Sequence, residues 1–139
     1  MTIQLFSDLH WFGVLLAFVP YFLLGALWFT VLFKKPYAFS LGRENEPQHN
    51  LAPIFIVGPA ICTLIITLAS GLLLNALHIE SYANALAFAV IVGVGYLVAN
   101  TINIAINPNI PRPLLYGAIS GAYHLVGILM VSLILVAMR

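Results

Sequence analysis

Four apolar runs, each long enough to cross a membrane, constrain this chain more than any other feature of its sequence. They cover approximately residues 11–33, 53–74, 83–106 and 114–138. A hydrocarbon core of about 30 Å needs about 20 consecutive apolar residues in a helix, and each run meets that length. Because a membrane-spanning helix satisfies its own backbone, the runs predict an all-α integral membrane protein. The short connections predict an up-down bundle of two helical hairpins, forming a single domain over residues 1–139.

The composition agrees with a bilayer as the main partner of this protein. Of the 139 residues, 63% are hydrophobic and 6% are charged, whereas a soluble domain carries about 25% charged residues. The net charge of +1 and the lack of a basic stripe argue against a nucleic-acid partner. Cys62 is the only cysteine, and the histidines are scattered along the chain, so neither a metal site nor a cofactor is expected.

The basic residues predict an orientation in the membrane. Four of the five lie in two connections on the same side of the bundle: Lys34, Lys35, Arg43 and Arg112. The positive-inside rule therefore places the connections 34–52 and 107–113 in the cytoplasm, with both termini outside the cell (inner) membrane.

Polar side chains recur along one face of the third run. Tyr96, Asn100 and Asn103 follow one another at i, i+4 and i+7, which is the spacing of a single helix face. Hydrocarbon offers an amide no hydrogen-bond partner, so this face is expected to meet protein, water or a ligand.

The fourth run carries a matching face. Gly117 and Gly121 have the small-residue spacing that allows two helices to approach closely, and Ser120 and His124 lie beside them. Counting outward from the turn near residue 110 places Gly117 at the depth of Asn103, Ser120 at that of Asn100, and His124 at that of Tyr96. The pattern therefore predicts that the two faces meet.

His124 is the only ionisable residue of the Asp, Glu, Lys, Arg and His types at the centre of a run. One interpretation is structural: Tyr96 and Asn100 hold a neutral imidazole in place. The other is functional, because a histidine at membrane depth suits proton coupling or a pH gate. In the first run, Tyr21, Gly25 and Trp28 share a face that is expected to pack against the other helices, with the lining of a cavity as the alternative.

Two segments resemble a known family. The stretch LGALWFTVLFKKPYAFSLG (24–42) and the stretch GAYHLVGILMVSLIL (121–135) are similar to the first and last helices of small bacterial membrane proteins catalogued as domain of unknown function 1761. The resemblance covers nearly the whole chain and implies four helices. It marks Trp28, Lys35 and His124 as candidates but implies no activity for them. The chain departs from the family at Lys34 and Tyr37, where Gly and Trp are usual.

These observations leave three functional hypotheses. The first is a homo-oligomeric solute transporter or channel with a polar site at Tyr96, Asn100 and His124. The second is an accessory or structural subunit that binds a membrane-protein partner, its polar stripe only holding helices together. The third, a membrane enzyme acting on a lipophilic substrate, has the least support, because no catalytic constellation is present in the runs.

Overall fold

The computed structural model describes residues 6–46 and 52–139, and these residues form helices without any strand. Four helices are long and apolar enough to span a membrane: Trp11–Leu32, Ile54–Ala76, Tyr82–Ala105 and Pro113–Ala137. Their ends lie within two residues of the predicted ones. The predicted all-α membrane fold is confirmed, and the chain is a multi-pass membrane protein.

Two of the spans are not uniform α-helices. The first consists of α2 (Trp11–Leu27) and a π-helical turn, η1 (Trp28–Leu32), and is followed by the short helix α3 (Lys34–Ser40). The second is α4 (Ile54–Ala76). The third is divided into α5 (Tyr82–Val92), the π-helical segment η2 (Gly93–Val98) and α6 (Ala99–Ala105). The fourth is α7 (Pro113–Ala137).

Local chemistry explains where several helices begin. The ring nitrogen Nδ1 of His10 accepts a hydrogen bond from the backbone N–H of Gly13 at 3.2 Å, which caps α2. The side chain of Ser81 caps α5 by accepting from the N–H of Asn84, also at 3.2 Å. Pro113 occupies the first position of α7, where its missing N–H has no intrahelical partner to lose.

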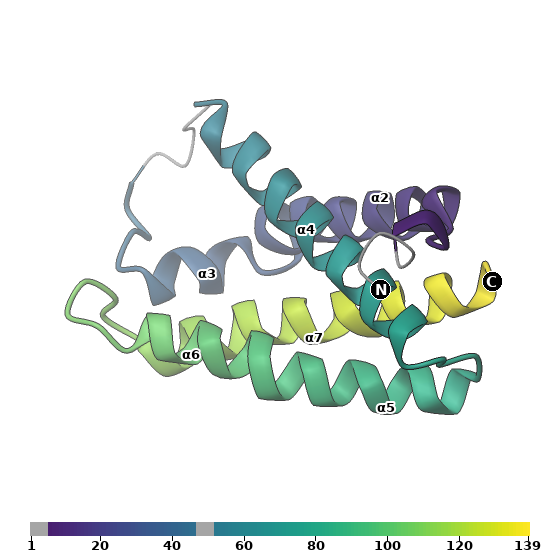
Figure 1. Ribbon diagram of the computed structural model, residues 1–139. Coiled ribbons are helices and arrows are strands. Elements are labelled where there is room, and N and C mark those ends of the chain that lie inside the picture. The colour runs from purple at the N-terminus through teal and green to yellow at the C-terminus, as the bar shows by residue number, and fades with distance from the viewer. Residues whose placement is uncertain (1–5, 47–51) are drawn as a thin grey trace.

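Helix α7 lies at the centre of the molecule. Figure 1 shows it antiparallel to α2 and to the α5–α6 span, with α4 crossing above. In its most apolar window 56% of the residues are buried, against 17–22% for the other three spans. The start of α2 and Arg139 lie with the 77–81 connection at one end of the bundle, and α3 lies with the 106–112 connection at the other (Figure 1). The two hairpins are therefore joined through α7.

Helix α4 packs against α2 and α7 through a face of small and hydroxyl residues. Thr67, Ser70, Gly71 and Leu74 are buried there, and the hydroxyls of Thr67 and Ser70 donate to carbonyls of their own helix at 2.8 and 2.7 Å. This back-bonding lets hydroxyl groups be buried without a partner on another helix. The first half of α4 leans away from the bundle (Figure 1), and the side chains of its first four residues, 54–57, are exposed.

Arg112 joins α3 to the connection before α7. Its guanidinium donates to the carbonyl of Phe39 and lies 3.5 Å from the centroid of that ring. Its backbone N–H donates to the carbonyl of the buried Ser40 at 3.3 Å. Beside this contact, the ring of Tyr37 packs on Tyr116 at 5.7 Å between centroids. Burial raises the pKa of Tyr37 to about 12, so its hydroxyl is neutral.

Candidate functional site

A reciprocal pair of tyrosines forms the seam between α2 and α7. Each helix carries the sequence Tyr-x-x-x-Gly, at residues 21–25 and 123–127. Because the two helices run antiparallel, each tyrosine covers the glycine of the other helix. A Cβ atom on Gly127 would overlap the ring of Tyr21, and one on Gly25 would lie 2.9 Å from the hydroxyl of Tyr123. The two rings are 5.4 Å apart between centroids.

This seam contains the intramembrane histidine. The hydroxyl of Tyr21, which is fully buried, lies 2.9 Å from Nδ1 of His124. Either atom can donate, depending on the imidazole tautomer. The hydroxyl of Tyr123 donates to the backbone carbonyl of Tyr21 at 3.5 Å. We call Tyr21, Tyr123 and His124 the tyrosine–histidine centre. Trp28 completes the seam by donating its Nε1–H to the carbonyl of Ile119 at 3.1 Å.

The prediction that Tyr96 and Asn100 hold His124 is wrong. The Tyr96 side chain is 71% exposed, and Asn100 is exposed as well. Both lie on the side of the third span that is turned away from α7. The partner that His124 has instead is Tyr21, which the sequence placed with Gly25 and Trp28 on a packing or cavity-lining face.

A small difference in register explains the error. Gly117 and Gly121 are buried against the third span, as expected, but their neighbours are Ile102 and Val98. A Cβ on Gly117 would lie 2.9 Å from Cγ1 of Ile102, and one on Gly121 would lie 3.2 Å from Cγ1 of Val98. Counting outward from the turn had paired Gly117 with Asn103, one residue further along. One residue turns a helix by about 100°, which moves the asparagines from the inner face to the outer one.

Ser120 is buried on α7, and its hydroxyl oxygen has no hydrogen-bond partner within residues 6–46 and 52–139. Among the same residues, no group of three His, Cys, Asp or Glu side chains could hold a metal ion.

Five residues of η2 and α6 make up a second polar feature, which we call the outer polar face: Gly95, Tyr96, Ala99, Asn100 and Asn103. They line a shallow hollow of about 540 Å³ on the outside of the bundle. The described part of the chain supplies no hydrogen-bond partner for the side chains of Tyr96, Asn100 and Asn103. A Cβ on Gly95 would meet nothing within 4 Å. This face is therefore accessible to the lipid, water or protein that lies beside the third span.

The outer polar face reaches deep into the bilayer. The third span ends at Ala105, and a rise of about 1.5 Å per residue puts Asn103 about 3 Å, Asn100 about 8 Å and Tyr96 about 14 Å from that end. Half of a hydrocarbon core is about 15 Å thick. Tyr96 is therefore near the middle of the membrane, whereas Asn103 is close to its surface.

Comparison with known proteins gives a family and no function. A family model described as a protein of unknown function (DUF1761) matches residues 12–136, which confirms the resemblance in the first and last helices. No curated protein and no solved structure matches the chain.

Proposed function

The chain belongs to the DUF1761 family, whose description assigns no activity, and we propose its function from the geometry. The protein is a homo-oligomer in which the outer polar faces of neighbouring copies meet and enclose a path for a small polar solute. One observation carries the proposal: Tyr96, Asn100 and Asn103 are exposed at membrane depth without a partner in the described chain.

Lipid is an unfavourable neighbour for this face. A hydroxyl or amide that leaves water without finding a hydrogen-bond partner costs several kcal/mol in hydrocarbon. The tyrosine hydroxyl near mid-membrane and the Asn100 amide both carry that cost if acyl chains cover them. A protein partner or a row of water molecules supplies hydrogen bonds and removes this cost. The face therefore favours assembly with another protein molecule.

A second copy of the same chain suits this face. Each asparagine amide has both donors and an acceptor, so two identical faces related by a twofold axis can hydrogen-bond to each other. Gly95 and Ala99 are four residues apart, and their small side chains allow two helix backbones to approach closely. The pairing leaves Tyr96 as the polar group at the deepest point between the copies.

The path lies between copies because the seam inside one copy is filled. Tyr21, Tyr123 and Trp28 occupy the region where α2 meets α7. In this proposal His124 is part of the scaffold, held by Tyr21, and does not line the path. The uncharged lining favours a small neutral solute over an ion.

The second candidate function is an accessory subunit, whose outer polar face binds a different membrane protein. The same exposed asparagines support it, since an amide pairs with any polar side chain on a facing helix. The two candidates differ in one respect: the accessory subunit needs its partner to cover the face, and the purified protein alone is then monomeric.

The orientation proposed for the bundle places α3 and the 106–112 connection in the cytoplasm, and both termini outside a cell (inner) membrane. It rests on four basic residues in α3, the segment after it and the 106–112 connection: Lys34, Lys35, Arg43 and Arg112. Cysteine labelling tests it in a Cys62→Ala background, because Cys62 is exposed. An impermeant reagent added to intact cells is expected to label Ser81→Cys and spare Asn45→Cys. The reverse pattern inverts the orientation.

The functional proposal is tested by combining oligomeric state with solute flux. Wild-type protein, the double variant Asn100→Leu/Asn103→Leu and the control Val90→Leu are purified, and their masses are measured by native mass spectrometry. We expect oligomers of the wild type and the control, and monomers of the double variant. Vesicles containing each protein are then shrunk osmotically with urea or glycerol, and only the two oligomeric proteins should speed re-swelling. A monomeric wild type would favour the accessory subunit.

A further inference from the structure

An open apolar cleft of about 620 Å³ lies between the end of α4 and α5. Leu73 and Leu77 line it from α4, and Phe88 and Ile91 line it from α5. Asn84 and Tyr96, the two side chains with polar groups in its lining, stand at opposite ends along the third span. The cleft therefore has apolar walls along its length and hydrogen-bonding groups at its ends.

The length of the cleft matches one leaflet of a bilayer. Asn84 is in the first turn of α5, at the membrane surface, and Tyr96 is twelve residues further along. At about 1.5 Å per residue the two are about 18 Å apart, close to the roughly 15 Å of half a hydrocarbon core. A groove of this length and polarity fits a single acyl chain that enters from the surface and ends near mid-membrane.

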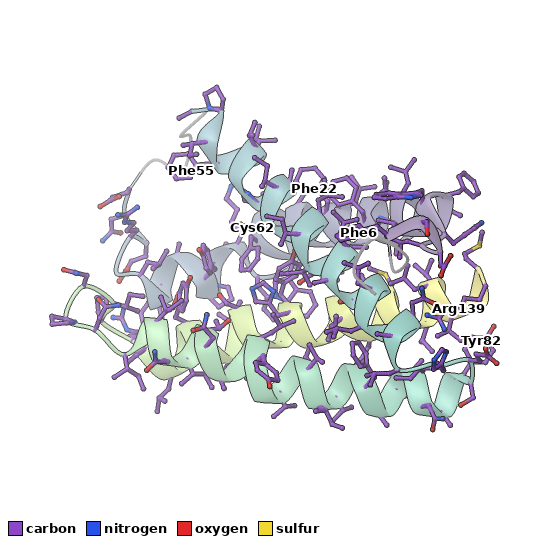
Figure 2. The ribbon with its side chains drawn as sticks, in the orientation of Figure 1. Phe6, Phe22, Phe55, Cys62, Tyr82 and Arg139 are labelled. Atoms are coloured by element: carbon purple, nitrogen blue, oxygen red, sulfur yellow. The ribbon has the colours of Figure 1, made fainter. Side chains whose placement is uncertain are left out.

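The positively charged side chain of Arg139 lies at the surface end of the cleft. The guanidinium of Arg139 donates to the backbone carbonyl of Ile79 at 2.8 Å, and Ile79 lines the cleft. Figure 2 shows Arg139 close to Tyr82, at the start of α5. A guanidinium has five N–H donors in a fork that matches the oxygens of a phosphate. The hydrogen bond to Ile79 uses one donor and holds the group at the mouth, and the exposed side chain leaves the other N–H donors accessible to a phosphate.

We propose that this cleft is a binding site for one membrane phospholipid. One acyl chain lies against Leu73, Leu77, Phe88 and Ile91, and the headgroup phosphate pairs with Arg139. The amide of Asn84 hydrogen-bonds the lipid near its ester groups. The cleft is formed within a single copy by the end of α4, the 77–81 connection, α5 and Tyr96 of η2, so it meets the outer polar face only at Tyr96.

Native mass spectrometry with added lipid tests the site. The probe is 1-palmitoyl-2-oleoyl-phosphatidylethanolamine, titrated onto delipidated protein in detergent. The variant Ala87→Phe fills the cleft, because Ala87 is an exposed residue in its lining. The matched control is Ala122→Phe, at an exposed position of α7 outside the cleft. We expect one lipid per copy on the wild type and the control, and binding at least about tenfold weaker in Ala87→Phe.

A second comparison tests the phosphate contact. Arg139→Gln is expected to weaken binding of the phospholipid several-fold and to leave binding of dioleoylglycerol, which lacks a phosphate, unchanged. Inorganic phosphate alone should not bind, because the acyl chain of the lipid supplies much of the binding affinity. Equal lipid binding by the wild type and Ala87→Phe would overturn the proposal that the cleft is the lipid-binding site. Equal loss of both lipids in Arg139→Gln would overturn the role of the phosphate. Thermal unfolding of each variant confirms that it is folded.

Discussion

At the scale of single residues, the α2–α7 seam depends on two glycines that leave room for two aromatic rings. Neither Gly25 nor Gly127 has the positive φ that would require glycine for its backbone. Glycine is needed there because the facing tyrosine occupies the volume that a side chain would fill. The close approach in turn brings the Tyr21 hydroxyl within 2.9 Å of His124. Ring packing and the intramembrane hydrogen bond therefore arise from the same pair of contacts.

Replacing Gly127 by alanine should destabilise the protein. The new methyl group would overlap the ring of Tyr21, and forced repacking of a tight core costs about 1–3 kcal/mol. Gly58→Ala is the control, since its methyl would lie an ordinary 3.9 Å from Ile54 and alanine favours the helix. Unfolding by sodium dodecyl sulfate, followed by circular dichroism, measures both. If Gly127→Ala lowers the free energy of unfolding no more than Gly58→Ala does, the α2–α7 seam is less tightly packed than described.

The hydrogen bond between Tyr21 and His124 should appear as an energetic coupling. Tyr21→Phe, His124→Leu and the double variant form a double-mutant cycle, with free energies of unfolding measured in detergent. Interhelical hydrogen bonds in membranes contribute about 0.6 kcal/mol on average and up to about 1.7, and we expect a coupling in that range. A parallel cycle with Tyr96→Phe in place of Tyr21→Phe should give no coupling. Equal couplings in the two cycles would contradict the assignment of Tyr21 as the partner.

At the scale of elements, the helix ends could be predicted, whereas the face that the third span turns inward could not. Run length and flanking residues such as Ser81 and Pro113 determine where a span begins, and both are local in the sequence. The face that a helix turns inward depends on register to within one residue, because each residue adds about 100° of rotation. The π-helical segment η2 adds further uncertainty, because a regular 3.6-residue period does not hold through it. The depth of Tyr96 and Asn100 in the membrane could therefore be predicted, but the side of the bundle to which they point could not.

Arg112 is expected to hold α3 in place. Ser40 is fully buried on α3, and the Arg112 guanidinium donates to the carbonyl of the neighbouring Phe39 and packs on its ring, contacts that alanine removes. In a Cys62→Ala background, Ser40→Cys should react slowly with a thiol reagent, and adding Arg112→Ala should speed the reaction several-fold. Arg43→Ala is the control, because Arg43 forms a single long exposed ion pair with Glu46 at 3.8 Å. Equal rates with and without Arg112 would mean that α3 is held by its aromatic contacts alone.

At the scale of the whole molecule, polar side chains of the spans lie in two regions, one inside the bundle and one on its outside. The hydroxyl and imidazole groups of Tyr21, Tyr123 and His124 lie inside, with partners on α2 and α7. The amides of Asn100 and Asn103 lie outside, without partners in the described chain. Composition alone predicted a membrane protein, and spacing alone predicted a polar face. Deciding that this face points outward required the contacts of Gly117 and Gly121 with Ile102 and Val98.

The central claim, that a second copy covers the outer polar face, is tested most directly by disulfide cross-linking in vesicles. Ala99 is exposed at the middle of the face, and Ala99→Cys is made in a Cys62→Ala background. Two such cysteines can bridge only when their Cα atoms are within about 7 Å. Mild oxidation should convert Ala99→Cys protein to a covalent dimer and leave Ala122→Cys, on the exposed side of α7, monomeric. A monomeric Ala99→Cys protein, or equal cross-linking at both positions, would contradict the account.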